Sequence, residues 1–137
     1  MKLIITFALL LLTSTVMATI GDVKVMPLGN DVELKLEEVT PSRIMPYTFY
    51  DQAMESIPAM YPKGQIIAKR RMGQFGEKNK LFYSLVAYTI REETKVVIIG
   101  GNIIFEKKAW SYSAQVPLES YSNYLVLILE HIARMAF

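Results

Sequence analysis

Histidine is the side chain most often used for acid–base chemistry and metal binding, and this chain has one, His131. A single imidazole cannot form a histidine-rich metal site, and triad chemistry would need a serine or cysteine nucleophile beside it. At helical spacing the neighbours of His131 are Leu127 and Arg134, neither of which orients a catalytic base. We therefore expect a surface or packing histidine and predict no metal site.

The other residues that could do chemistry are two pairs of acids and one pair of glycines. Glu37-Glu38 and Glu92-Glu93 are adjacent in sequence, so on a strand the members of each pair point to opposite faces. Two carboxylates flanking one bond could then arise only between distant segments. Gly100-Gly101 lacks a phosphate-loop lysine or a G-x-G-x-x-G pattern. Glycine inside a strand marks a bulge or a close approach of backbone, and we expect a kink there. The sequence therefore predicts a protein that is not an enzyme, with no catalytic residues and no cofactor.

The amino-terminal residues have the pattern of an export signal. Lys2 precedes the apolar run Leu3–Leu12, which Thr13–Thr15 interrupts before the small-x-small sequence Val16–Ala18. A helix that spans a bilayer needs about 20 apolar residues, more than this run supplies. We predict a signal peptide over residues 1–18, cleaved after Ala18; the alternative is an uncleaved anchor.

Residues 19–137 are then predicted to form one domain, large enough to fold without disulfides. The chain has no cysteine and no Asn-x-Ser/Thr site for a glycan. An exported protein with neither feature fits a bacterial periplasm better than an animal extracellular fluid. No later apolar run is long enough to span, so we expect no membrane span after cleavage.

The hydrophobic pattern predicts an α+β fold. Asp31–Val39 alternates between apolar and polar residues, which is typical of a strand with one wet face. Leu81–Ile90 and Val96–Phe105 are apolar on both faces, which indicates interior strands. The predicted elements are a strand at Val23 and Val25, a strand at Asp31–Val39, a helix between Pro46 and Pro58, strands at Gln65–Met72, Leu81–Ile90, Val96–Phe105 and Trp110–Val116, and a helix from Pro117. We expect an antiparallel sheet of about five to six strands with an inserted short helix and a long C-terminal helix packed on it.

The C-terminal helix is apolar over much of its circumference. Its predicted buried stripe is Leu118, Tyr121, Leu125, Ile128, Leu129, Ile132 and Met135, widened by Val126 and Leu127. Such a helix packs against both the sheet and another element, or offers an apolar strip to a partner. Burial within the fold is the interpretation we favour.

Charge is distributed unevenly along the chain. Residues 22–55 hold seven acids and three bases, whereas residues 63–80 hold six bases and one acid. Such asymmetry indicates either a binding surface for an acidic partner or a solvated face. Nucleic-acid binding would need a more basic domain.

The predicted contact surface lies on the basic strand and the loop that follows it. Lys69, Arg71, Phe75 and Lys78 are its main candidates. Phe75 lies between two glycines, so it either contacts a partner or folds back onto the sheet. The apolar, proline-bounded loop at Met60 and Tyr61 is either a plug over the core edge or part of the same contact site.

The order of these elements resembles the Mog1/PsbP-like α/β modules from Phe49 to Met135. The likeness is in the helix–loop–strand over Ala53–Arg71, the strand LFYSLVAYTI, and WSYSAQVP leading into the last helix. The resemblance implies helices flanking an antiparallel sheet, no catalytic residues, and a role as a binding or accessory module.

Our leading hypothesis is an exported, periplasmic protein that binds another macromolecule as an accessory, inhibitor or immunity-type factor. The alternative is a carrier of a small apolar ligand, with a pocket between sheet and helix. Its expected lining is Trp110, Tyr112, Phe82 and Tyr88. A hydrolase would need a carboxylate cleft that the sequence does not indicate.

Overall fold

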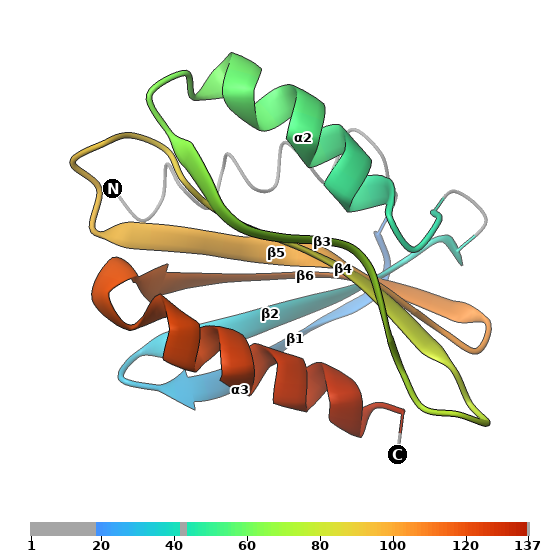
Figure 1. The fold of residues 1–137 in the computed structure, drawn as a ribbon. Helices are drawn as coiled ribbons and strands as arrows, with labels where there is room; N and C mark the ends of the chain where they lie inside the picture. The colour runs from blue at the N-terminus through green and yellow to red at the C-terminus, as the bar shows by residue number, and fades with distance from the viewer. Residues whose placement is uncertain (1–18, 42–43, 137) are drawn as a thin grey trace.

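The protein forms a six-stranded antiparallel sheet with one helix on each face (Figure 1). The computed structural model describes residues 19–41 and 44–136, and the predicted signal peptide lies outside them. The elements are β1 (Thr19–Gly29), β2 (Val32–Val39), α2 (Thr48–Met60), β3 (Gln65–Phe75), β4 (Leu81–Thr89), β5 (Val96–Phe105), β6 (Lys108–Pro117) and α3 (Tyr121–Arg134). The strand order is β1-β2-β6-β5-β4-β3, so β1 and β3 are the sheet edges. The predicted α+β fold is confirmed.

The first hairpin turns at Asn30 and Asp31. Both have positive φ, 53° and 63°, a backbone conformation that asparagine and aspartate tolerate better than most residues. Strand β1 therefore extends beyond the predicted Val23 and Val25, and Pro27–Gly29 still belongs to it. The alternation predicted for β2 is confirmed, with Val32, Leu34 and Leu36 buried.

The two helices cover different strands. On one face, Phe49, Ala53 and Ile57 of α2 pack against residues of β4 and β5, including Tyr88 and Ile98. On the other face, α3 packs over β5 and β6. Figure 1 shows α2 and α3 separated by the sheet, with β3 running past both. No helix in the described part of the chain is long and apolar enough to cross a membrane.

The helix boundaries differ from the sequence prediction at two prolines. Pro58 lies inside the last turn of α2, which continues to Met60, so the prediction that Pro58 stops this helix is wrong. A proline so close to the end removes one backbone hydrogen bond, and the N–H of Tyr61 still donates to the carbonyl of Ile57. Pro117 ends β6; a 3₁₀ turn over 118–120 follows, and α3 starts at Tyr121.

The buried stripe of α3 is centred on Tyr124, Ile128 and Ile132, which repeat every four residues. The sequence analysis placed Leu118 in the stripe, but Leu118 is 38% exposed because it precedes the helix. Val126 is 55% exposed, on the side of α3 away from the sheet. The prediction that α3 is buried within the fold is confirmed for the side that faces the sheet, whereas the opposite side is exposed at Val126.

Strand β3 is longer than predicted. Gly73–Phe75, expected to be loop, continues the strand beside β4. Two register shifts interrupt this pairing, one between Ile66 and Ala68 and one between Arg70 and Gly73. Bulges of this kind are common on edge strands.

At Gly101 neighbouring groups approach the backbone of β5 closely, and the strand has no bulge there. No register shift interrupts the pairing of β5 with β4 or with β6 at Gly100 and Gly101, although the pairs with β4 skip Gly101 and Asn102. The predicted kink stays a prediction. A Cβ at Gly101 would collide with the carbonyl oxygen of Ser84 and with the hydroxyl of Tyr112. Glycine is required there because the neighbouring groups leave no room for a side chain.

Candidate functional site

The most buried polar cluster in the described residues surrounds Asn102. Its Oδ1 accepts from the N–H of Phe49 and from the hydroxyl of Ser84, at 3.0 Å each. Its Nδ2 donates to the carbonyl of Met45 at 2.8 Å. The Tyr112 hydroxyl donates to the carbonyl of Ser84, and burial raises the pKa of Tyr112 well above its ordinary value. These groups satisfy one another, so the cluster fixes the start of α2 and offers no reactive group.

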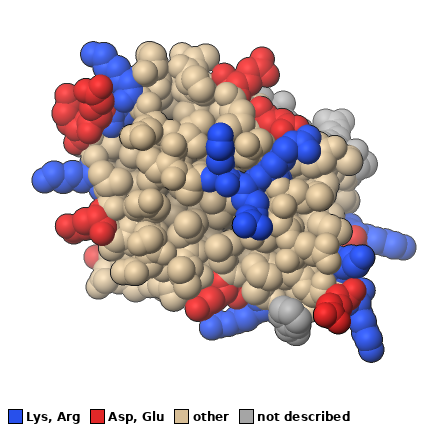
Figure 2. Space-filling model, viewed as in Figure 1, with Lys and Arg blue, Asp and Glu red and all other residues tan. Residues whose placement is uncertain are grey.

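The predicted basic strand is the sheet edge β3. Figure 2 shows a group of Lys and Arg side chains near the centre of the view, where β3 passes between the helices in Figure 1. Lys69, Arg70 and Arg71 are all exposed. Lys69 pairs with Val86 and so lies on the α2 face, whereas Arg70 pairs with Leu85 on the α3 face.

Arg71 is already engaged within the protein. Its Nε and Nη2 donate to the two carboxylate oxygens of Asp51 on α2, at 3.0 Å each. Its guanidinium also lies 3.7 Å from the centre of the Tyr47 ring. The hydrogen bond to Asp51 raises the pKa of Arg71. This residue ties α2 to the sheet edge.

Phe75 and Lys78 lie apart from that contact. Phe75 stacks on Tyr83 at 5.1 Å between ring centroids and packs against the core on the α3 face. This is the alternative in which Phe75 folds back onto the sheet. Lys78 is exposed in the turn between β3 and β4.

Met60 and Tyr61 end α2. Tyr61 stacks on the buried Tyr88 at 6.3 Å, and partial burial raises the pKa of Tyr61. Met60 is 38% exposed. Tyr61 thus covers a core residue, as the plug interpretation expected. The predicted contact residues are distributed over both faces of the sheet and two loops, and their role in partner binding stays a prediction.

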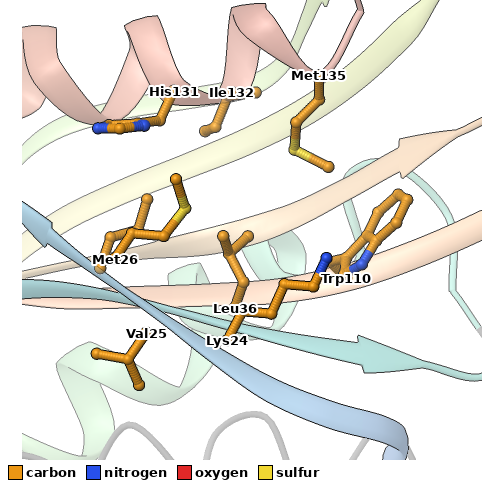
Figure 3. A pocket seen from close by; sticks show the side chains of 9 residues that line it. Lys24, Val25, Met26, Leu36, Trp110, His131, Ile132 and Met135 are labelled. Atoms are coloured by element: carbon orange, nitrogen blue, oxygen red, sulfur yellow. The ribbon is translucent and has the colours of Figure 1, made fainter.

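A pocket lies between α3 and the β1–β2 end of the sheet (Figure 3). Its volume is about 530 Å³. The lining residues are Lys24, Val25, Met26, Leu34, Leu36, Trp110, His131, Ile132 and Met135. They come from β1, β2, β6 and the last two turns of α3.

Strand pairing explains which side chains reach this pocket. Lys24 and Met26 of β1 pair with Leu36 and Leu34 of β2, so all four share the α3 face. Val25 pairs with Lys35 on the opposite face, and Figure 3 shows its side chain pointing away from the pocket. The helix packs mainly over β5 and β6, so the sheet extends beyond it at β1 and β2.

The pocket wall is apolar apart from three residues. Lys24, His131 and Trp110 contribute donors, and no lining residue is acidic. Leu34, Leu36 and Ile132 are buried, whereas Lys24 is exposed at the mouth. The described residues contain no group of acidic or histidine side chains that could hold a metal. The arrangement suits binding of an apolar molecule with one polar end.

The lining expected from the sequence is only partly right. Trp110 lines the pocket, and Tyr112 lies on the same face but is fully buried. Tyr88 packs under α2 on the opposite face, and Phe82, an even number of residues away on β4, shares that face. Every lining residue except Trp110 was absent from the predicted lining. The alternation of β1 would have found Lys24 and Met26 once Val32, Leu34 and Leu36 fixed the buried face of β2.

Comparison with known protein families and with curated proteins gives no match to this chain. The resemblance to Mog1/PsbP-like modules therefore stays a prediction.

Proposed function

We propose that this protein binds a small apolar ligand in the pocket between α3 and the β1–β2 hairpin, and that it acts without catalysis. The observation that carries the proposal is the cavity of about 530 Å³ with a mainly apolar wall. Ligand pockets have volumes of about 300–1,000 Å³ and combine apolar walls with a few polar groups. The predicted export signal supports a carrier or sensor outside the cytoplasm.

The pocket is suited to accommodate ligands of different shapes. Met26 and Met135 lie on opposite sides of it, one on β1 and one at the end of α3 (Figure 3). Methionine is unbranched and polarizable, so it adapts to irregular apolar surfaces at low cost. Both residues are partly exposed, which leaves them free to move aside on binding.

The single tryptophan gives a direct test, because Trp110 lines the pocket. Titration with the neutral fluorophore N-phenyl-1-naphthylamine should quench Trp110 and increase probe emission. Met26→Arg places a charge inside the pocket and should weaken probe binding by about tenfold or more, since burying an unpaired charge is costly. Val23→Arg is the matched control, because Val23 lies on the same strand, is 44% exposed and is not part of the pocket lining. Equal binding by both variants, or no binding by the unmodified protein, would contradict the proposal.

A protein partner with an acidic surface is the second candidate, favoured by the edge position of β3 and its consecutive exposed bases Lys69, Arg70 and Arg71. An unpaired edge can add a strand from a partner, and the bases would select an acidic one. The same charges could serve only to prevent aggregation through the edge.

The two roles of the basic edge can be separated by charge reversal. Lys69→Glu with Arg70→Glu spares the Arg71–Asp51 ion pair and should leave the melting temperature nearly unchanged. Loss of one stoichiometric, salt-sensitive partner from an envelope extract would support the interface. Self-association of the variant without loss of a partner would indicate edge protection alone.

A further inference from the structure

We infer that the ligand of this pocket is a single-chain amphiphile with a carboxylate head, held at the mouth by Lys24. The inference rests on the proposed function and adds the chemical class of the ligand.

Two donors at one end of the pocket have no acceptor. In the described part of the chain, no hydrogen bond or ion pair engages the Nζ of Lys24 or the indole N–H of Trp110. Figure 3 shows the Lys24 side chain extending along the sheet toward the Trp110 end of the pocket. Lysine and the indole N–H only donate, so a ligand group that contacts them must be a hydrogen-bond acceptor. A charged acceptor forms the stronger hydrogen bond with an ammonium group.

The remaining wall supplies a place for one apolar chain. Leu34, Leu36 and Ile132 are at most 7% exposed and form the floor and one side. They come from two strands and a helix, which makes the apolar part a slot between layers. The ligand head therefore stays with Lys24 at the exposed mouth, and its tail enters between α3 and the sheet.

One carboxylate, Glu38, lies two residues along β2 from Leu36, the residue that pairs with Lys24. Glu38 pairs with Trp110 across β2 and β6 and shares the α3 face with Leu36, although it does not line the pocket. Its negative charge disfavours a second anion nearby. Glu38→Gln should therefore strengthen binding of an anionic ligand and leave a neutral one unaffected.

The experiment compares decanoate, decan-1-ol and acetate as competitors of N-phenyl-1-naphthylamine on the purified protein at neutral pH. We expect decanoate to displace the probe at about two- to fivefold lower concentration than decan-1-ol, the range for one exposed charge pair. Acetate, which has the head without the tail, should not displace it. In Lys24→Gln the preference for decanoate should disappear, and in Glu38→Gln it should increase.

A matched variant tests whether the position of the charge matters. Lys35→Gln removes the same charge from the same hairpin, but from the opposite face of the sheet. This variant should change decanoate affinity less than twofold. A loss as large as in Lys24→Gln would overturn the assignment of the head group.

The outcomes separate this inference from the proposed function. Equal displacement by decanoate and decan-1-ol would overturn the carboxylate head and leave the apolar pocket intact. Displacement by acetate would also overturn it, because the site would then bind small anions. Failure of the fluorophore and of both long-chain competitors to bind would overturn the proposed function as well.

Discussion

The two helices cover the two faces of one sheet in different ways. The start of α2 is held by the side chain of Asn102, and its exposed side is joined to the edge strand by the Asp51–Arg71 ion pair. The side chain of Tyr124 on α3 accepts one longer hydrogen bond, 3.3 Å, from Asn30, and α3 otherwise rests on apolar contacts.

This difference explains where a ligand can enter. Directional bonds fix α2 at one position, because moving it would leave buried donors and acceptors unpaired. Apolar contacts are not directional, so α3 can shift slightly without such a penalty. The pocket lies under α3, next to the two strands that this helix leaves partly uncovered.

The largest expected effect comes from breaking the anchor of α2. Asn102→Ala would leave the Phe49 N–H and the Ser84 hydroxyl without an acceptor in a buried site, whereas the Met45 carbonyl would still accept from Thr48. We expect a loss of about 3 kcal/mol in the free energy of unfolding, measured by urea denaturation, since each buried unsatisfied group costs about 1–3 kcal/mol. A loss below about 1 kcal/mol would mean that α2 does not depend on this anchor.

A smaller effect of opposite sign is expected at Tyr88. Its hydroxyl is buried and has no hydrogen-bond partner, and burial, together with Tyr61, raises its pKa. Tyr88→Phe should increase stability by about 1 kcal/mol, because it removes an unpaired polar group at nearly constant volume. Tyr112→Phe is the matched control and should destabilise by a similar amount, since it removes the hydrogen bond to Ser84. Thermal unfolding of the two variants, measured in parallel with the unmodified protein, shows whether each change raises or lowers the melting temperature.

The smallest expected effect is on the α3 side. Asn30→Gly removes the hydrogen bond to Tyr124 and keeps a residue that tolerates positive φ. We expect a change in unfolding free energy of no more than about 0.5 kcal/mol, because the bond is long and partly exposed. A loss of unfolding free energy as large as that of Asn102→Ala would contradict the conclusion that directional hydrogen bonds hold α2 more strongly than α3.

Sequence patterns predicted the elements well and the site poorly, for a physical reason. Two-sided apolarity correctly marked β4 and β5 as interior strands, since burial of both faces is a property of each strand alone. The pocket depends on which strands α3 covers and on the pairing of β2 with β6, whose paired residues are 70 to 78 positions apart. No local pattern contains that information. Phe75 illustrates the same limit, because its stacking partner Tyr83 is defined by pairing across an edge strand.

The most direct test of the ligand pocket is a methyl NMR titration of protein labelled at its eight methionines. Met26 and Met135 line the pocket, whereas Met60 and Met72 are exposed outside it. On addition of decanoate, the account predicts shifts of the Met26 and Met135 methyl resonances with those of Met60 and Met72 unchanged. Shifts confined to Met60 and Met72, or no shifts at all, would contradict it.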